Sequence, residues 1–335
     1  MIRLILFIQL LMGFSLAETQ GAPVRVYTYD ALTGKGSFAA YLGEEFRKKG
    51  GSVEWISFGT AGEALNQIVI EGEKTRADVI MGIDPVLFQK GADREIFEPV
   101  SADVKKNIFP ELLLKQAPAF VPYDFGYLAF VYDNRVTPAL SSPSLEGFVT
   151  QIRKTDKIVL QDPRTSLLGI EFLIWTREKL KSRFSQFWEN LGPHILTVSP
   201  GWSGAYELFL RGQAQYVLSY TTSPAYHLMR EHKDHIRAVL FQEGHFKQVE
   251  GLALLKTSKQ KHKALELIRL VLSQEAQTQL PTYQWMYPVH KNVKLPKEFI
   301  KLAVPKTAEM DWHRVLREKE QWIKEWTLIM SKKSP

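Results

Sequence analysis

The order of apolar and polar positions first indicates short buried strands that alternate with amphipathic helices. Three strand-like runs come early in the chain: VRVYTY (24–29), VEWISF (53–58) and ADVIMGI (77–83). Helix-like stretches, FAAYLGEEFRKKG and GEALNQIVIEGEK, separate them. This alternation is typical of βαβ units, in which helices cover a parallel sheet. We therefore predict a first α/β lobe.

A second set of strand-like runs follows residue 156. It consists of KIVLQ (157–161), HILTVS (194–199) and YVLSY (216–220), and a helical pattern follows each run. Each of these helices has a start signal, because Ser166 follows DPRT, Ser203 follows GW, and Ser223 precedes Pro224. Serine and proline favour the N-cap and first-turn positions of helices. A second α/β lobe is expected here.

Two long extended runs, at 120–134 and 237–256, flank this second set. They indicate that the first lobe is discontinuous and that both runs cross between the lobes as a hinge. The expected fold is two α/β lobes, each a mainly parallel sheet flanked by helices, joined by a two-crossing hinge. The expected parts are a signal peptide (1–17), lobe 1 (18–126 and 251–305), lobe 2 (127–250) and an amphipathic C-terminal helix packing on the lobes (306–335).

The N-terminus has the pattern of a secretory signal peptide. Arg3 precedes an apolar run from Leu4 to Leu16, and a small-residue site ends at Ala17. This run is too short and wrongly flanked for a spanning helix, and no later segment approaches about 18 uninterrupted apolar residues. The alternative is an N-terminal anchor that stays attached. We expect a mature protein that is exported, soluble and periplasmic.

Composition narrows the function classes. The chain has 335 residues, 45% of them hydrophobic, which suits a buried core in two domains. It contains no cysteine, so disulfides, a thiol nucleophile and lipid attachment through cysteine are excluded. The formal charge of +7 comes from basic residues that are mixed with acids along the chain. This mixture is typical of solvated helix faces, and we expect no nucleic-acid partner.

No catalytic or metal-binding motif is complete. GWSGA (201–205) lacks the final glycine of a nucleophile elbow, and a Walker A loop is absent. TYDALTGKGSFA has near-Rossmann glycine spacing, but the following strand ends without the acid that a ribose needs. HKDH (232–235) has the spacing of a charged surface loop rather than of a zinc site. Scattered acids could form general acid/base pairs in the folded chain: Asp84, Asp124 and Asp162.

The loops that follow the strands are better candidates for a site. Ligands of open α/β sheets bind beyond the carboxyl ends of the strands, where amide groups at helix starts face the cleft. In the second lobe these loops are 162–166, 201–203 and 220–223, and the first lobe contributes Tyr29, Asp30, Thr60 and Asp84. Hydroxyls and free amides suit an oxygen-rich or phosphorylated group, and aromatic rings suit a flat or cationic one.

With these loops in view, the chain resembles the periplasmic thiamine-binding proteins of bacterial ABC importers. The matching segments are VYTYD, ADVIMGID, FVPYDFGYLAFVYD, QDPRTS, GWSGAYELFLRG, LSYTTSPAYH, EGHFKQVE and WMYPV. The resemblance implies a two-lobed type II binding protein that closes on thiamine, thiamine monophosphate or thiamine diphosphate. It also implies a monomer without catalytic activity, cofactor or metal, which delivers its ligand to an inner-membrane permease and its ATPase.

The resemblance also implies a set of ligand contacts. They are Tyr29, Thr60, Ala61, Ser166, Leu167, Trp202, Tyr220, Thr221, Thr222, Ser223, Tyr226 and Trp285, with Tyr29, Tyr226 and Trp285 as aromatic walls. The sequence departs from the family in three places. Thr60 and Ala61 stand where an Asp-Gly pair is expected, Leu167 replaces a threonine, and a tryptophan is missing from ALTGKGSF. The lost acid leaves the preference among thiamine and its phosphates open.

Two alternatives remain at this point. One is a related exported binding protein for another solute, such as a ferric ion or a polyamine, because one architecture serves many ligands. The other is a secreted hydrolase that uses acids of the cleft. The tryptophans provide a test of the site: Trp202→Ala or Trp285→Ala should weaken thiamine binding and leave the melting temperature nearly unchanged. Trp322→Ala, in the C-terminal helix, should do the reverse.

Overall fold

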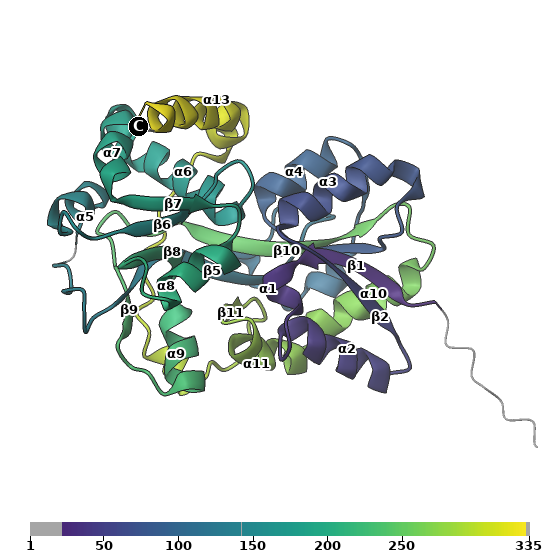
Figure 1. Ribbon diagram of the computed structural model, residues 1–335. Helices are drawn as coiled ribbons and strands as arrows, with labels where there is room; N and C mark the ends of the chain where they lie inside the picture. Colours follow the sequence, from purple (N-terminus) through teal and green to yellow (C-terminus); the bar gives the residue numbers. More distant parts are fainter. Residues whose placement is uncertain (1–21, 142, 333–335) are drawn as a thin grey trace, which may run out of the picture.

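The computed structural model describes residues 22–141 and 143–332, so the expected signal peptide lies outside the described residues. The strands are β1 (Val24–Tyr29), β2 (Val53–Phe58), β3 (Val79–Ile83), β4 (Phe97–Glu98), β5 (Val121–Asp133), β6 (Ile158–Gln161), β7 (Ile195–Ser199), β8 (Tyr216–Tyr220), β9 (Ile236–Ala238), β10 (Lys247–Leu255) and β11 (Tyr287–Pro288). The helices are α1 (Asp30–Thr33), α2 (Phe38–Lys48), α3 (Ala61–Glu71), α4 (Pro85–Ala92), α5 (Leu145–Gln151), α6 (Leu167–Leu180), α7 (Phe184–Leu191), α8 (Trp202–Leu210), α9 (Ser223–Glu231), α10 (Lys261–Val271), α11 (Gln274–Tyr283), α12 (Lys297–Ile300) and α13 (Trp312–Ser331). Figure 1 shows that these elements form two lobes side by side.

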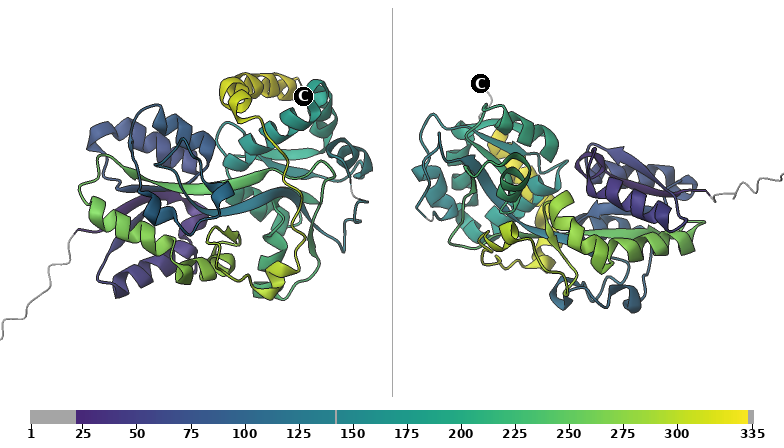
Figure 2. Two further views of the ribbon diagram at one scale, coloured as in Figure 1. Left: turned by 180° about the vertical axis from the view of Figure 1, so that it is seen from behind. Right: turned by 90° about the horizontal axis from the view of Figure 1, so that it is seen from below.

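Lobe 1 is built on the strand order β2-β1-β3-β10. β1 pairs in parallel with β2 and β3, and β10 lies antiparallel to β3. Helices cover both faces of this sheet, as the two further views show (Figure 2). One face packs on α2 and α10 through Phe38, Leu42 and Leu267, and the other packs on α3 through Leu65 and Ile68. Because both faces are covered, every residue of β3 is buried.

Lobe 2 is built on β8, β6 and β7, which are parallel to one another. A large aromatic core on one face joins β6 and β8 to α6, α7 and α13, with Phe172, Trp175 and Trp188 at its centre. The opposite face packs on α8 through Tyr206 and Phe209. The strands predicted from the sequence are therefore all present, and the α/β architecture of both lobes is confirmed.

One strand belongs to both lobes. The first half of β5 pairs with β10, up to the partners Tyr127 and Lys247, and its second half pairs with β8 from Leu128 onward. The chain returns to lobe 1 between β9 and β10. Both extended runs that the sequence analysis singled out thus pass between the lobes, side by side. Because β5 runs from one sheet directly into the other, any relative rotation of the lobes must be confined to a few residues.

A third connection follows α11, which the sequence pattern does not predict. β11 pairs with β5, α12 contacts α9, and α13 packs against α6 and α7 of lobe 2. The amide of Ala308 donates a hydrogen bond of 2.7 Å to the carbonyl of His245, next to the hinge. The end of lobe 1 at residue 305 stays a prediction, and α12, which lies before that boundary, already contacts α9 of lobe 2. Over the residues that the structure describes, no helix is long and apolar enough to cross a membrane.

Candidate functional site

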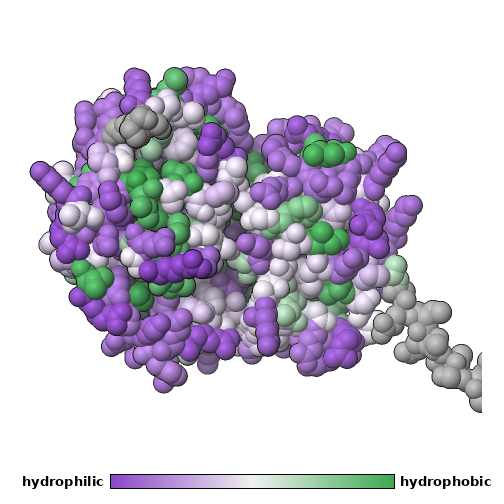
Figure 3. All heavy atoms as spheres, viewed as in Figure 1, coloured by the Kyte–Doolittle hydropathy of each residue, from purple (hydrophilic) through white to green (hydrophobic). Residues whose placement is uncertain are grey.

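A cavity of about 650 Å³ lies between the two lobes. Its walls come from the carboxyl ends of the strands and from the helix starts that follow them, as expected for an open α/β sheet. The surface is hollowed between the lobes at this place (Figure 3). A cavity of this size suits a small organic molecule.

The structure brings together nearly all of the site residues expected from the sequence. Those that line the cavity are Tyr29, Thr60, Ala61, Ser166, Leu167, Trp202, Tyr220, Ser223, Tyr226 and Trp285. Thr221 and Thr222 are not among them. Their side chains are only 3% and 1% exposed, and neither hydroxyl has a hydrogen-bond partner in the described part of the chain. The YTTS turn therefore presents Tyr220 and Ser223 to the cavity and buries the two threonines beneath it.

Trp202 and Tyr206 form one aromatic wall on α8. Their rings stack at 4.7 Å with an angle of 23°, and Trp202 Nε1 donates a hydrogen bond of 2.9 Å to Ser219 Oγ. Tyr206 Oη lies 2.9 Å from Nε2 of His227, whose Nδ1 lies 2.8 Å from Glu231. This chain of contacts holds the Tyr206 ring, which in turn orients Trp202. Trp202 also packs against both cores of lobe 2, so it is in part a core residue.

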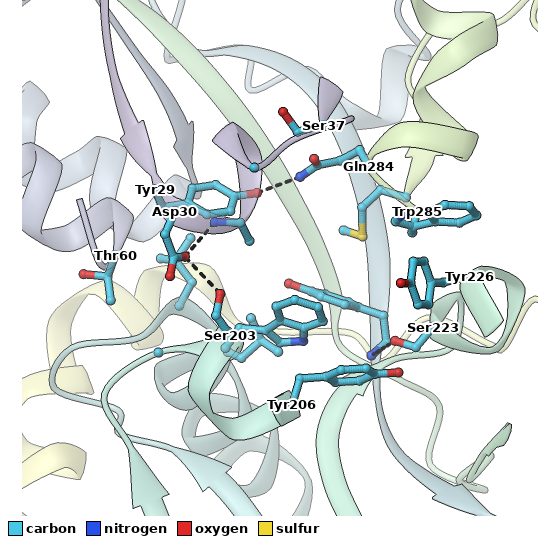
Figure 4. Close-up of a pocket in the computed structure, with 18 of the residues that line it drawn as sticks. Tyr29, Asp30, Ser37, Thr60, Ser203, Tyr206, Ser223, Tyr226, Gln284 and Trp285 are labelled. Carbon is cyan, nitrogen blue, oxygen red and sulfur yellow. Dashed lines mark hydrogen bonds between the residues drawn. The ribbon is translucent and has the colours of Figure 1, made fainter. Parts of the chain in front are cut away.

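Trp285 and Tyr226 form a second wall and lie next to each other in Figure 4. Their rings meet edge to face at 5.1 Å, and the guanidinium of Arg230 lies 5.6 Å from the Trp285 ring. Trp285 has φ of +61°, in the left-handed region that a bulky residue rarely adopts. Such a conformation persists only where the surroundings hold it, and it occurs frequently at ligand sites.

Three helices of lobe 2 begin at the cavity without a capping side chain. The N-cap residues of α6, α8 and α9 are Ser166, Gly201 and Thr222, and none makes a side-chain cap bond. In lobe 1, by contrast, Thr60 and Asp84 cap α3 and α4. The first amides of an uncapped helix need an outside acceptor, and they attract negative charge. This side of the cavity therefore suits an oxygen-rich or anionic group.

Thr60 does not replace a carboxylate. Its Oγ1 accepts the cap bond from Glu63 N at 3.1 Å, so the hydroxyl is already occupied. A buried carboxylate enters the cavity elsewhere, from Glu250 on β10. Glu250 is 4% exposed, and its Oε2 accepts hydrogen bonds from Tyr29 Oη at 2.8 Å and Tyr123 Oη at 2.6 Å. The sequence analysis missed it because a lone acid in an extended run has no distinguishing spacing.

Glu250 belongs to a group of buried acids at the hinge. Burial raises its pKa to about 7. Burial also raises the pKa of Asp84, to about 6, and the pKa values of Asp124 and Glu171 well above their usual range. Glu250 adds to the rise of the pKa at Asp124 and Glu171, because like charges oppose ionisation. Protons are therefore held at the hinge near neutral pH.

Comparison with known proteins decides the family. The sequence profile described as "Bacterial extracellular solute-binding protein" matches residues 29–278. The chain belongs to this family. The family consists of binding proteins rather than enzymes, so the hydrolase alternative is wrong for this solute-binding protein. In the described part of the chain, no group of three His, Cys, Asp or Glu side chains could hold a metal ion.

Two similar proteins at 35% identity are both described as thiamine-binding. The solute-binding protein is 35% identical over 315 residues to the "Thiamine-binding periplasmic protein" of Salmonella typhimurium, covering 92% of this chain and 93% of that one. A solved "Periplasmic thiamin binding protein" superimposes with a TM-score of 0.85 at 35% identity, over 92% of this chain and 96% of that one. A ferric binding protein from Campylobacter jejuni has a TM-score of 0.76 at 15% identity, over 91% and 99% of the two chains. The last match shows the fold alone.

Several lining residues of the solute-binding protein were not predicted. They include Tyr206, Arg230, Glu250, Tyr283, Gln284 and Met286. Tyr206 lies one helical turn after Trp202, so that spacing was the one signal available for it. Gln284 Nε2 donates a hydrogen bond of 2.7 Å to Tyr29 Oη, a contact between residues far apart in the chain. Only the fold brings such pairs together.

Proposed function

We propose that this protein is the periplasmic thiamine-binding component of an ABC importer. It binds thiamine or its phosphates between the lobes and delivers the ligand, as a monomer, to an inner-membrane permease and its ATPase. The observation that supports this most directly is the 35% identity to thiamine-binding periplasmic proteins over 92% of the chain, with the matched loops lining one cavity.

The chemistry of the cavity fits both ends of thiamine. Its pyrimidine and its positively charged thiazolium are flat rings, which stack well on tryptophan and tyrosine, and the cation gains a further attraction to their faces. Trp202, Tyr220, Tyr226 and Trp285 supply such faces. The hydroxyethyl group or its phosphates would meet the uncapped starts of α6, α8 and α9.

Titration calorimetry with thiamine, thiamine monophosphate and thiamine diphosphate tests the proposal. We expect saturable binding of at least one of the three, with one site per chain and a dissociation constant of about 1 μM or tighter, which corresponds to about −8 kcal/mol. The phosphates should also be recovered intact after incubation, because binding involves no turnover.

Two control ligands separate the alternatives. Ferric ion as a citrate complex and spermidine as a polyamine should give no saturable heat at the same concentrations. Binding of either with no binding of the three thiamine compounds would contradict the proposal, and the protein would then serve another solute. Release of inorganic phosphate would equally contradict a purely binding role.

A further inference from the structure

Two buried carboxyl groups face each other across the hinge. Glu250 on β10 is the register partner of Asp124 on β5, and the two are 4% and 0% exposed. Neither oxygen of Asp124 has a hydrogen-bond partner in the described part of the chain. Directly opposed like charges destabilise a pair of strands, so two ionised carboxylates cannot both persist here. The pair therefore holds at least one proton when the cavity is empty.

The backbone directs Glu250 into the cavity. The pairing of β10 with β5 shifts register between Glu250 and Gly251, which marks a bulge. A bulge re-aims the side chain beside it. Gly251 permits this path, because a Cβ at that position would collide with the ring of Phe120. The tyrosine hydroxyls of residues 29 and 123 then hold one carboxylate oxygen in place.

Glu250 differs from the other acids of the cavity. The remaining acids that line it are Asp30 and Glu207, and both are exposed to solvent. At the position where the family places a carboxylate this chain has Thr60, whose hydroxyl caps a helix. A cation in the cavity therefore meets one desolvated carboxyl group among the described lining residues, and that group is Glu250.

We propose that Glu250 is the counter-ion of the ligand's positively charged ring and that it releases its proton when the ligand binds. The inference rests on the proposed function. The neutral carboxyl loses its proton to the buffer and the carboxylate pairs with the cation, so charge and protons balance. The site thus selects a cationic heteroaromatic ligand and couples its uptake to pH.

The direction of the pH effect follows from the surroundings of Glu250. The titratable groups that act on it or feel its charge come from four elements and one strand end: Tyr29 (β1), Asp84 (after β3), Tyr123 and Asp124 (β5), Glu171 (α6) and Tyr220 (β8). None of them is positively charged, and burial raises the pKa of Glu250 to about 7. A bound cation favours the ionised form and lowers this pKa. Binding therefore expels a proton below pH 7 and weakens as the pH falls.

Calorimetry with thiamine between pH 5.5 and 8.5 tests this inference, in two buffers with different ionisation enthalpies. For the parent we expect a constant affinity above about pH 7.5 and a loss that approaches about tenfold per pH unit below pH 7. The heat should differ between the buffers, because the released proton is taken up by the buffer. Glu250→Gln should bind at least about tenfold more weakly at pH 8 and show no buffer-dependent heat.

Glu171→Gln is the matched control, because Glu171 is equally buried, also has a raised pKa and does not line the cavity. It should keep the parent's pH profile. Any slope that remains in Glu250→Gln belongs to the ligand and is subtracted. If Glu250→Gln does not fold, the parent protein alone tests the inference: a binding heat that differs between the two buffers supports proton release, and an equal heat contradicts it.

Different results would overturn the role of Glu250 and the proposed thiamine-binding function. Thiamine binding with equal affinity at pH 6 and pH 8 and no proton release would overturn the role of Glu250 and leave the proposed function standing. A Glu250→Gln protein that binds as tightly as the parent would do the same. Absence of thiamine binding at every pH would overturn the proposed function and this inference with it.

Discussion

At the residue scale, Trp202 shows how one side chain serves both the site and the core. Its ring stacks on Tyr206 at the cavity, and its indole N–H bonds to Ser219 in the β8 strand beneath. It also contacts the two apolar cores of lobe 2. We therefore revise the expectation that its removal leaves the melting temperature nearly unchanged, because alanine would leave a void in packed surroundings.

We predict that Trp202→Ala weakens thiamine binding about tenfold or more and also lowers the melting temperature. The loss of a stacked or cation–π contact costs on the order of 1 kcal/mol or more, which sets the size of the affinity change. Trp322→Ala is the control. Trp322, on α13, is 1% exposed in the core of lobe 2, so its removal should cost about 3–5 kcal/mol of unfolding free energy and leave the affinity unchanged.

Calorimetry below the melting transitions, combined with thermal unfolding of the free proteins, separates the two effects. Trp285→Ala should resemble Trp202→Ala in affinity, because both rings line the cavity. Unaltered thiamine affinity in Trp202→Ala would show that the aromatic wall on α8 is not part of the binding site, even with the family assignment intact.

At the element scale, the start of α6 depends on one close approach. Gly169, in the first turn, lies against the loop that ends β6, and a Cβ there would stand 2.6 Å from the carbonyl oxygens of Gln161 and Asp162. Backbone atoms cannot move aside as a side-chain tip can. Glycine at this position thus lets the helix start reach the cavity, with Ser166 and Leu167 in its lining.

We predict that Gly169→Ala lowers the free energy of unfolding by about 1–3 kcal/mol, the usual range for overpacking. It should also weaken ligand binding, because the start of α6 must shift away from the cavity. Chemical denaturation and calorimetry measure the two effects.

Gly43→Ala in α2 is the matched substitution. A Cβ at Gly43 would meet Trp55 and Val53 at 3.5 Å, an ordinary contact distance. Alanine there should stabilise the helix by about 0.5–1 kcal/mol without changing affinity. A Gly169→Ala protein as stable as the parent would mean that the α6 start tolerates displacement.

At the scale of the whole molecule, three chain segments connect the lobes: the shared strand β5, the return from β9 to β10, and the stretch from β11 to α13. Across the cavity mouth, Ser203 Oγ of lobe 2 donates a hydrogen bond of 3.1 Å to Asp30 Oδ1 of lobe 1. A second hydrogen bond of 3.1 Å runs from Arg230 Nη2 of α9 to the carbonyl of Thr282 in α11. The connections lie side by side, because β10 and β11 both pair with β5. This arrangement favours rotation about the hinge.

We predict that ligand closes the lobes, which is a hinge motion of the kind seen in periplasmic binding proteins. Small-angle X-ray scattering with and without saturating thiamine should show a smaller radius of gyration in the bound state. Ser203→Ala removes the bond to Asp30 and should enlarge the radius of the free protein without preventing closure by ligand. An unchanged radius at saturating ligand would contradict the hinge.

The sequence by itself determined the main strands of both lobes, the helices that follow them and the family. Periodicity identifies β1 to β3 and β6 to β8 because these strands are rich in apolar, β-branched and aromatic residues, which is a local property. The long apolar run of β5 and the extended run at 237–256, which contains β10, could be recognised in the sequence for the same reason. Loop motifs such as QDPRTS and SYTTSPAYH contain many of the predicted site residues. They could be assigned to one site because the strand ends of one sheet meet at one edge.

Only the tertiary structure decided which side chains of those loops face the ligand. Thr221 and Thr222 are buried although their neighbours Tyr220 and Ser223 line the cavity. Glu250 is directed into the site by a bulge in β10 and lies opposite Asp124 of β5. Two tyrosines from other strands, Tyr29 and Tyr123, donate hydrogen bonds to its carboxylate. These contacts join residues more than a hundred positions apart. Local pattern cannot reveal them, because burial and charge pairing arise from the packing of the whole chain.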